Sequence, residues 1–196
     1  MPIRRVFSVY KHAALLVVSF CLLCPLVQAQ ILKVPEIDVF GGYSYLRFGG
    51  SQLGFPGALN LNGGNVEVSV HVYQGFGIVA DFSGHSSQDL EEYNFLIGGQ
   101  YKFDVKNLHF YGHGLGGKAR TRLENIGASQ GEPSSLGGAA LLGGGFEVPW
   151  KDRIVFRPVQ LDYLLTGAFG DKFKSLRVST GIVFRFGKLP KKEPGL

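Results

Sequence analysis

Residues 93–103 read YNFLIGGQYKF, and the spacing of their side chains decides the fold. In an extended strand, successive side chains point to opposite faces. One face of this stretch is then entirely apolar or glycine: Tyr93, Phe95, Ile97, Gly99, Tyr101 and Phe103. The other face is mostly polar or small: Asn94, Leu96, Gly98, Gln100 and Lys102. A period of two residues with this contrast predicts an amphipathic β-strand.

The same alternation recurs along the chain and predicts seven further strands, at residues 38–45, 65–72, 76–83, 108–117, 140–148, 153–165 and 176–186. Within 153–165 the phase slips at Pro158, which cannot donate to a ladder, so we expect a bulge there. The expected connections alternate between short ones (73–75, 104–107, 149–152) and longer ones (48–64, 84–92, 118–135, 166–174). This layout predicts an all-β, eight-stranded antiparallel up-and-down transmembrane β-barrel with its termini and short turns in the periplasm.

A soluble barrel such as a lipocalin could have the same strand count, because the pattern does not say which face points outward. We favour the membrane for two reasons. The polar faces combine charged residues with Gly and Ser and hold few long apolar side chains, as a narrow packed lumen requires. Aromatic residues on the apolar face lie near both strand ends, which is typical of two interfacial girdles.

Residues 1–29 have the features of a signal peptide, with Arg4, Arg5 and Lys11 preceding an apolar run that ends before Pro25. We expect cleavage after Ala29. An uncleaved anchor is the alternative, but the run is shorter than the roughly 20 residues that a spanning helix needs. Removing the segment takes three cations and no acid from 20 Lys+Arg and 15 Asp+Glu, so the net charge falls from +5 to +2.

That near-neutral balance is no nucleic-acid signature. Both cysteines also lie in the signal segment, at Cys21 and Cys24. The mature chain would therefore have no disulfide, no thiolate nucleophile and no cysteine metal site.

Several segments in order resemble the small OmpA-like outer-membrane β-barrel proteins. They are DVFGGYSY at 38–45, VADFSG at 79–84, QLDYL at 160–164 and RVSTGIVFRFG at 177–187. The resemblance implies a barrel domain over residues 30–187, in contact with outer-membrane lipid and lipopolysaccharide. It also implies insertion by the outer-membrane barrel assembly machinery, which reads an aromatic-rich last strand. Family members often end at that strand, whereas this chain continues as a short basic tail, 188–196, too short for a peptidoglycan-binding domain.

Charged residues recur on the polar faces of the predicted strands, and we expect them to form one ion-pair network that blocks the lumen. Charges in a narrow, poorly hydrated interior are rarely left unpaired, because removing one partner leaves the other charge buried and uncompensated. The candidates are Asp38, Glu67, Asp81, Lys102, Glu147, Arg157, Asp162, Arg177 and Arg185. His109 and His113 share a face but lie about 13 Å apart along the strand, too far to bind one metal ion together.

The sequence contains no motif for catalysis, a metal or a cofactor, and it names no external partner. We expect a non-enzymatic protein with a structural or surface-interaction role, exerted through its long extracellular loops. The first alternative is a small pore for solutes. The second is a lipid A-modifying barrel enzyme, for which His85 with Ser83, Ser86 or Ser87 would be the candidate residues.

Overall fold

A computed structural model describes residues 35–49, 57–123 and 134–187. The predicted signal peptide and C-terminal tail lie outside these ranges. The described residues form eight strands: β1 (Ile37–Phe48), β2 (Leu59–Tyr73), β3 (Phe76–Ser86), β4 (Leu90–Val105), β5 (Leu108–Leu123), β6 (Ser134–Lys151), β7 (Ile154–Ala168) and β8 (Asp171–Phe186). In this part of the chain there is no helix of sufficient length and apolarity to cross a membrane.

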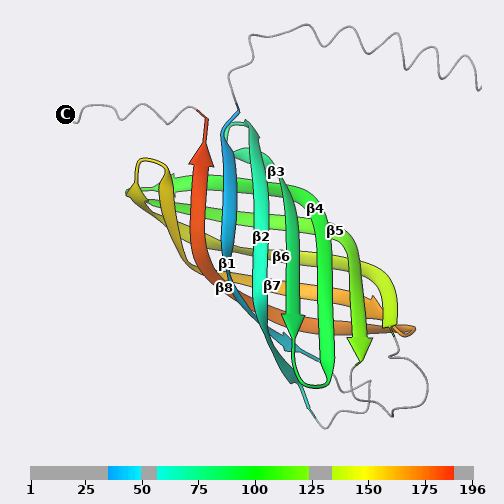
Figure 1. The fold of residues 1–196 in the computed structure, drawn as a ribbon. Helices are drawn as coiled ribbons and strands as arrows, with labels where there is room; N and C mark the ends of the chain where they lie inside the picture. Colours follow the sequence, from blue (N-terminus) through cyan, green and yellow to red (C-terminus); the bar gives the residue numbers. More distant parts are fainter. Residues whose placement is uncertain (1–34, 50–56, 124–133, 188–196) are drawn as a thin grey trace, which may run out of the picture. The chain divides into compact units, whose positions relative to one another are not determined.

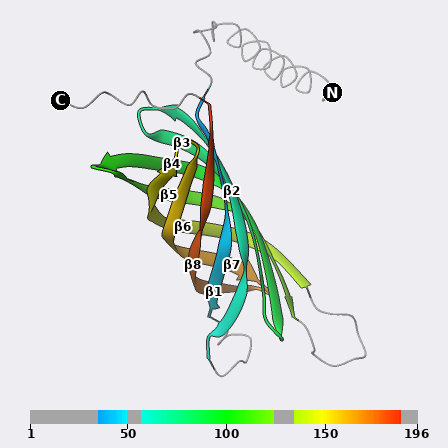
Figure 2. The ribbon, with the colours of Figure 1, turned by 60° about the vertical axis from the view of Figure 1, so that its left-hand side comes forward.

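The strands close into one antiparallel barrel in sequence order (Figure 1). The seam is formed by β1 and β8, which pair without interruption from Ile37↔Phe186 to Phe48↔Ser175. Figure 2 shows β8 and β1 side by side along the wall. The predicted eight-stranded up-and-down barrel is therefore confirmed. The predicted bulge is confirmed as well, as a register shift between Arg157 and Gln160 on either side of Pro158.

The predicted loop lengths are wrong for two of the four longer connections. In place of a loop over 84–92, β3 continues to Ser86 and β4 begins at Leu90. In place of a loop over 166–174, β7 and β8 meet in a tight turn at Phe169 and Gly170, both with positive φ. Gly, Ser and Thr residues are typical of loops, but in these stretches ladder pairing with the neighbouring strands keeps them extended.

The outer surface of the wall is apolar over much of its height. Large apolar side chains stand exposed on it, among them Phe95 at 53%, Ile97 at 50% and Leu142 at 71%. A contiguous apolar surface of this kind is costly in water and suits lipid. At the end that holds the three short turns, which we call the turn end, successive rings touch around the wall: Phe76, Tyr101, Phe103, Phe110 and Phe146, with centroids 4.7–6.4 Å apart. This row is one aromatic girdle.

Toward the opposite end, which we call the loop end, the interior is apolar. Leu46, Phe48, Leu61, Leu90 and Phe173 are completely buried there, and the rings of Phe48 and Phe173 stack at 5.1 Å. The expectation of few long apolar residues inside the barrel is therefore wrong at this end. The reason is that the outer face changes too: Arg47, Asn60, Asn62, Lys172 and Lys174 are exposed on it. Here the wall has the polarity of a water-soluble barrel.

Strand length explains why the polarity inverts. The 16 residues of β5 span about 40 Å along the barrel axis, at about 3.3 Å per residue and a tilt of about 40°. The apolar band of an outer-membrane barrel is only about 25 Å tall. The wall therefore continues beyond the bilayer, and the part in water packs apolar residues inward.

Neighbouring glycines on β4 provide a test of the wall geometry. A Cβ at the inward-facing Gly98 would lie 2.0 Å from the Gly114 carbonyl oxygen, whereas at the outward-facing Gly99 the nearest atom would be 3.9 Å away. We expect Gly98→Ala to destabilise the barrel by about 1–3 kcal/mol through overpacking, and Gly99→Ala to be close to neutral. Urea unfolding in lipid vesicles measures both. Equal effects would contradict the assignment of the two faces.

The lipid-facing position of Ile97 provides a second test. A cation near the bilayer midplane costs about 2–4 kcal/mol, so Ile97→Arg should lower the free energy of unfolding in vesicles by about that amount. Ser86→Arg is the matched control, because Ser86 is exposed at the loop end of β3. Its effect should be within the error of the measurement. A barrel that tolerates both arginines equally would be inconsistent with a lipid-facing β4.

Candidate functional site

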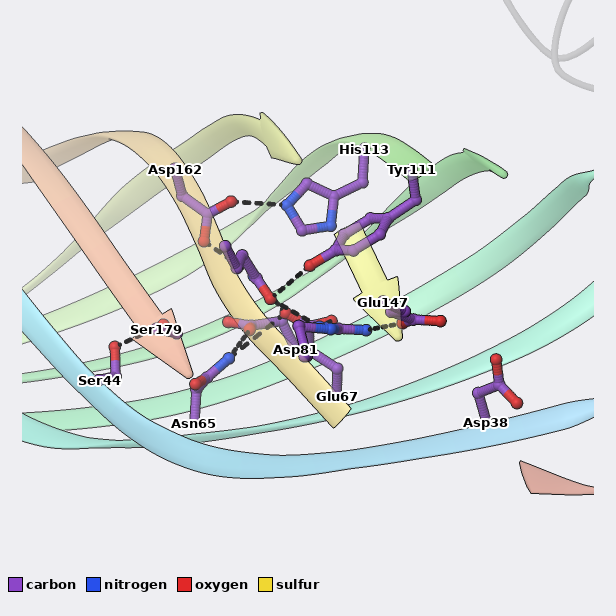
Figure 3. Close-up of polar contacts among 12 residues, drawn as sticks. Asp38, Ser44, Asn65, Glu67, Asp81, Tyr111, His113, Glu147, Asp162 and Ser179 are labelled. Atoms are coloured by element: carbon purple, nitrogen blue, oxygen red, sulfur yellow. Dashed lines mark hydrogen bonds and ion pairs between the residues drawn. The ribbon is translucent and has the colours of Figure 1, made fainter. Parts of the chain in front are cut away.

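The structure brings the nine charged candidates together inside the barrel. All of them face inward, and they come from seven strands, from β1 through β8. Eight are buried and the Lys102 side chain is only 8% exposed. Figure 3 shows Asp38, Glu67, Asp81, Glu147 and Asp162 directed into this interior. They form a continuous set of contacts that fills the middle and the turn end of the lumen.

Arg177 is the deepest cation of this set and is completely buried. Its two terminal nitrogens donate to the two carboxylate oxygens of Asp81, at 2.9 and 3.0 Å. Its Nε donates to Asp162 Oδ2 at 2.9 Å. Bidentate pairing of a guanidinium with a carboxylate fixes both groups, and two such acids satisfy most of the donors of this side chain.

Arg157 links two further acids across the lumen. Its guanidinium donates to Glu67 Oε2 at 2.7 Å and to Glu147 Oε1 at 2.8 Å. Its planar head also lies between two rings, with its central carbon 4.1 Å from the Phe40 centroid and 4.4 Å from the Tyr111 centroid. Ion pairs hold the edges of the guanidinium while aromatic rings cover its faces. Phe40, a buried aromatic residue on β1, is thus part of the charged site.

The turn end of the network is held by Lys102 and Arg185. Lys102 Nζ contacts Asp38 Oδ2 at 2.5 Å and Glu147 Oε2 at 3.2 Å. Arg185 Nε contacts Asp38 Oδ1 at 3.1 Å and Glu36 Oε1 at 2.9 Å. Asp38 and Glu147 are each shared between cations, and Glu36 extends the charged layer toward the mouth of the barrel.

Sequence reasoning missed two uncharged members of the network, Gln160 and Tyr111. Gln160 Nε2 donates to Glu67 at 2.5 Å and to Asp162 at 2.9 Å, while its carbonyl oxygen accepts from Arg157 and from the Tyr111 hydroxyl. His113 Nε2 lies 2.7 Å from Asp162 Oδ1. The parity of Gln160 and Tyr111 places both inward, which was the available signal. His109, by contrast, contacts Asp104 at the turn end, away from His113.

A smaller polar group lies nearer the loop end. His85 Nε2 and Ser44 Oγ are 2.8 Å apart, and the Ser179 hydroxyl donates to Ser44 at 2.9 Å. His85, Ser83 and Ser44 are all buried in the interior. A lipid-modifying enzyme would need its histidine and serine to reach the lipid. Within the described residues, the proposed pair of His85 with Ser83 faces the lumen instead, and Ser86 is exposed at the strand end.

One group of side chains near the turn end has the spacing of metal ligands. The ligand atoms of Glu36, Asp38 and His71 all lie within 4.8 Å of one another. Both carboxylates, however, already contact Arg185, and Asp38 also contacts Lys102. A divalent cation would have to displace these positive charges, so the group is better described as the outer part of the ion-pair network.

The fold is shared with solved membrane proteins. The structure of neisserial surface protein A aligns with a TM-score of 0.60 at 15% identity, covering 76% of this chain and 97% of that one. The chain has the fold of the small outer-membrane β-barrels. Ail of Yersinia pestis, solved in complex with the heparin analogue sucrose octasulfate, aligns with a TM-score of 0.54 at 18% identity, covering 78% and 99%. No protein-family model and no curated protein matches the sequence.

Arg177 is the residue whose removal tests this network of the outer-membrane barrel. Arg177→Ala leaves Asp81 and Asp162 buried without their main partner, and breaking a buried pair in this way costs about 3–5 kcal/mol. We expect a loss of that size in urea unfolding from vesicles. The double variant Arg177→Ala with Asp81→Asn should recover part of it, because it removes one of the stranded charges. Arg47→Ala, at an exposed position on β1, is the control and should change little.

Proposed function

We propose that this protein is a non-conducting, non-enzymatic outer-membrane barrel with a structural or surface-interaction role at its loop end. The observation that carries the proposal is the filled lumen. An eight-stranded barrel has an interior just wide enough for side chains to fill it. In this chain, two different kinds of packing fill that space one above the other.

The first barrier is the ion-pair network, in which side chains from opposite walls meet. Arg177 on β8 reaches Asp81 on β3, and Arg157 on β7 reaches Glu67 on β2. The second barrier is the apolar section at the loop end, where Leu46, Phe48 and Phe173 are completely buried. A hydrated ion would have to separate buried ion pairs and then cross a dry apolar layer. A solute pore, the first alternative, is disfavoured on these grounds.

The surface role is supported by the height of the wall. The loop end stands beyond the apolar band and carries exposed cations on its outer face, including Arg47, Lys172 and Lys174. Segments 50–56 and 124–133 connect strands at this end. The other two connections at this end, between β3 and β4 and between β7 and β8, are tight turns. An external partner would therefore meet two segments and the rim of the strands, and not four long loops.

Topology and export complete the proposal. With residues 1–29 removed as a signal peptide, the barrel over 30–187 would be inserted by the assembly machinery with its turn end in the periplasm. The tail, 188–196, would then remain on the periplasmic side. The loop end would face the cell exterior, where lipopolysaccharide forms the surrounding leaflet. The enzyme alternative is disfavoured by the inward direction of His85 and Ser83.

Single-channel recording tests the closed lumen. The refolded barrel in planar bilayers should give no steady conductance steps, because either barrier alone is sufficient to block it. Arg177→Ala should therefore remain silent as long as it folds, and so should Phe173→Ala, which thins only the apolar section. A variant carrying both changes is the one in which steps are expected. Steady, large steps from the wild type would overturn the proposal in favour of a pore.

A further inference from the structure

The buried charges of the barrel interior do not balance. Six carboxylates are buried there, against four inward-facing cations. The carboxylates belong to Asp38, Glu67, Asp81, Glu92, Glu147 and Asp162, and the cations to Lys102, Arg157, Arg177 and Arg185. Among the described residues, two negative charges are therefore in excess. A proton on His113, whose Nε2 lies 2.7 Å from Asp162 Oδ1, would compensate one of them and leave the other.

The remaining excess charge is located at Glu92 on β4. Glu92 is completely buried, and within the described part of the chain it is the one buried carboxylate that makes no ion pair. Asn94 Nδ2 donates to Glu92 Oε1 at 3.1 Å, whereas Glu92 Oε2 has no hydrogen-bond partner. Arg177, the cation whose field reaches Glu92, uses its donors on Asp81 and Asp162. Glu92 thus lies outside the ion-pair network.

The side chains around Glu92 also present polar atoms without a partner. In register, Glu92 lies directly between His85 on β3 and Thr121 on β5, and Asn94 is the next inward residue on β4. Directly opposite side chains have Cβ atoms about 5 Å apart. Thr121 Oγ1, Asn94 Oδ1 and His85 Nδ1 have no hydrogen-bond partner, and all three residues are buried. Buried polar atoms of native proteins nearly always have one, which can be a water or an ion.

The chemistry of these atoms fits a hard monovalent cation. Glu92 supplies one negative charge, while Asn94 and Thr121 supply a neutral carbonyl oxygen and a hydroxyl oxygen. Hard cations prefer such oxygen ligands. A sodium or potassium ion would neutralise the single carboxylate, whereas a divalent ion would leave a positive charge in excess in an interior that already holds Arg177.

We propose that Glu92, Asn94 and Thr121 bind one alkali metal cation, sodium or potassium, inside the barrel. The site lies between the ion-pair network and the apolar section at the loop end, which includes Leu90 on the same strand. Both neighbours block the lumen, so the ion enters as the barrel folds and remains enclosed. Because the unfolded chain has no such site, the ion stabilises the folded barrel.

Protonation is the competing way to remove the charge. Glu92 would itself take a proton, or His85 would become a cation opposite to it. His85, however, makes no ion pair with Glu92 in the described structure, and its Nε2 contacts Ser44 Oγ at 2.8 Å. A proton makes the stability depend on pH alone, whereas a bound ion makes it depend on which cation is present.

The test is urea unfolding of the barrel from vesicles of neutral lipid in mildly alkaline buffer, with choline chloride replaced stepwise by sodium or potassium chloride. Constant ionic strength leaves the screening of surface charges unchanged, and choline is too bulky for the site. With one site, the unfolding equilibrium constant should fall by up to about tenfold for each tenfold rise of the cation above its dissociation constant. Glu92→Gln keeps the shape and removes the charge, so its stability should be the same in all three salts.

Glu91→Gln is the matched control. Glu91 precedes Glu92 on β4 and belongs to the outer face, where its Oε2 lies 3.6 Å from Arg122 Nη1. This variant should keep the full difference between the alkali salts and choline. Thr121→Val removes one neutral ligand of nearly the same shape, so its response should move to higher cation concentration.

The proposal is overturned if the wild type is equally stable in the three salts while its stability changes with pH. It is also overturned if Glu91→Gln loses the response as Glu92→Gln does, or if Thr121→Val responds at the same concentration as the wild type. A response to calcium without one to sodium or potassium would exclude a monovalent ion. If Glu92→Gln does not refold, the comparison of salts on the wild type and Thr121→Val decides. None of these outcomes depends on whether the barrel conducts.

Discussion

The structure depends on the closure of eight strands into a wall too narrow to hold bulk water. Closure satisfies the backbone hydrogen bonds that lipid cannot satisfy, and it abolishes exposed sheet edges. It also leaves an interior that side chains must fill completely. The carboxylates of the ion-pair network are tolerated there because each of them meets a cation, as Asp81 meets Arg177 through two hydrogen bonds. Where the wall rises out of the bilayer, the same narrow space is filled instead by leucine and phenylalanine.

The sequence was sufficient for the strand count, the order of pairing and the inward charges, because alternation fixes which residues share a face whatever lies outside. It was not sufficient for the length of the strands. A strand section in water places Asn, Gly and Ser outward, and these are the residues that mark loops. Hence the alternation predicts β3 and β4 shorter than they are, and it leaves the buried Leu90 in a loop. Gln160 was missed for a different reason, since an amide carries no charge to draw attention to it.

Glycine has two distinct roles in the wall, which composition alone cannot separate. Gly98 and Gly117 face inward where a neighbouring carbonyl oxygen lies too close for any side chain. Gly112 and Gly114 face outward, where space is free. The first kind is explained by the diameter of the barrel. The second kind is not required by the packing of the barrel, because a Cβ at these positions would meet no atom closer than 3.7 Å.

The ion-pair network joins the two ends of the chain. Arg157 and Glu67 are 90 residues apart, Arg177 and Asp81 are 96 apart, and Arg185 and Asp38 are 147 apart. Glu67 on β2 and Asp81 on β3 thus meet no cation until the last two strands arrive, whereas Asp38 on β1 also meets Lys102 on β4. A nascent barrel that lacks β8 would carry unpaired carboxylates in a nearly dry interior and would be strongly disfavoured in lipid. The network therefore acts as a thermodynamic checkpoint for chain completeness, since only a full-length polypeptide can neutralise its own interior.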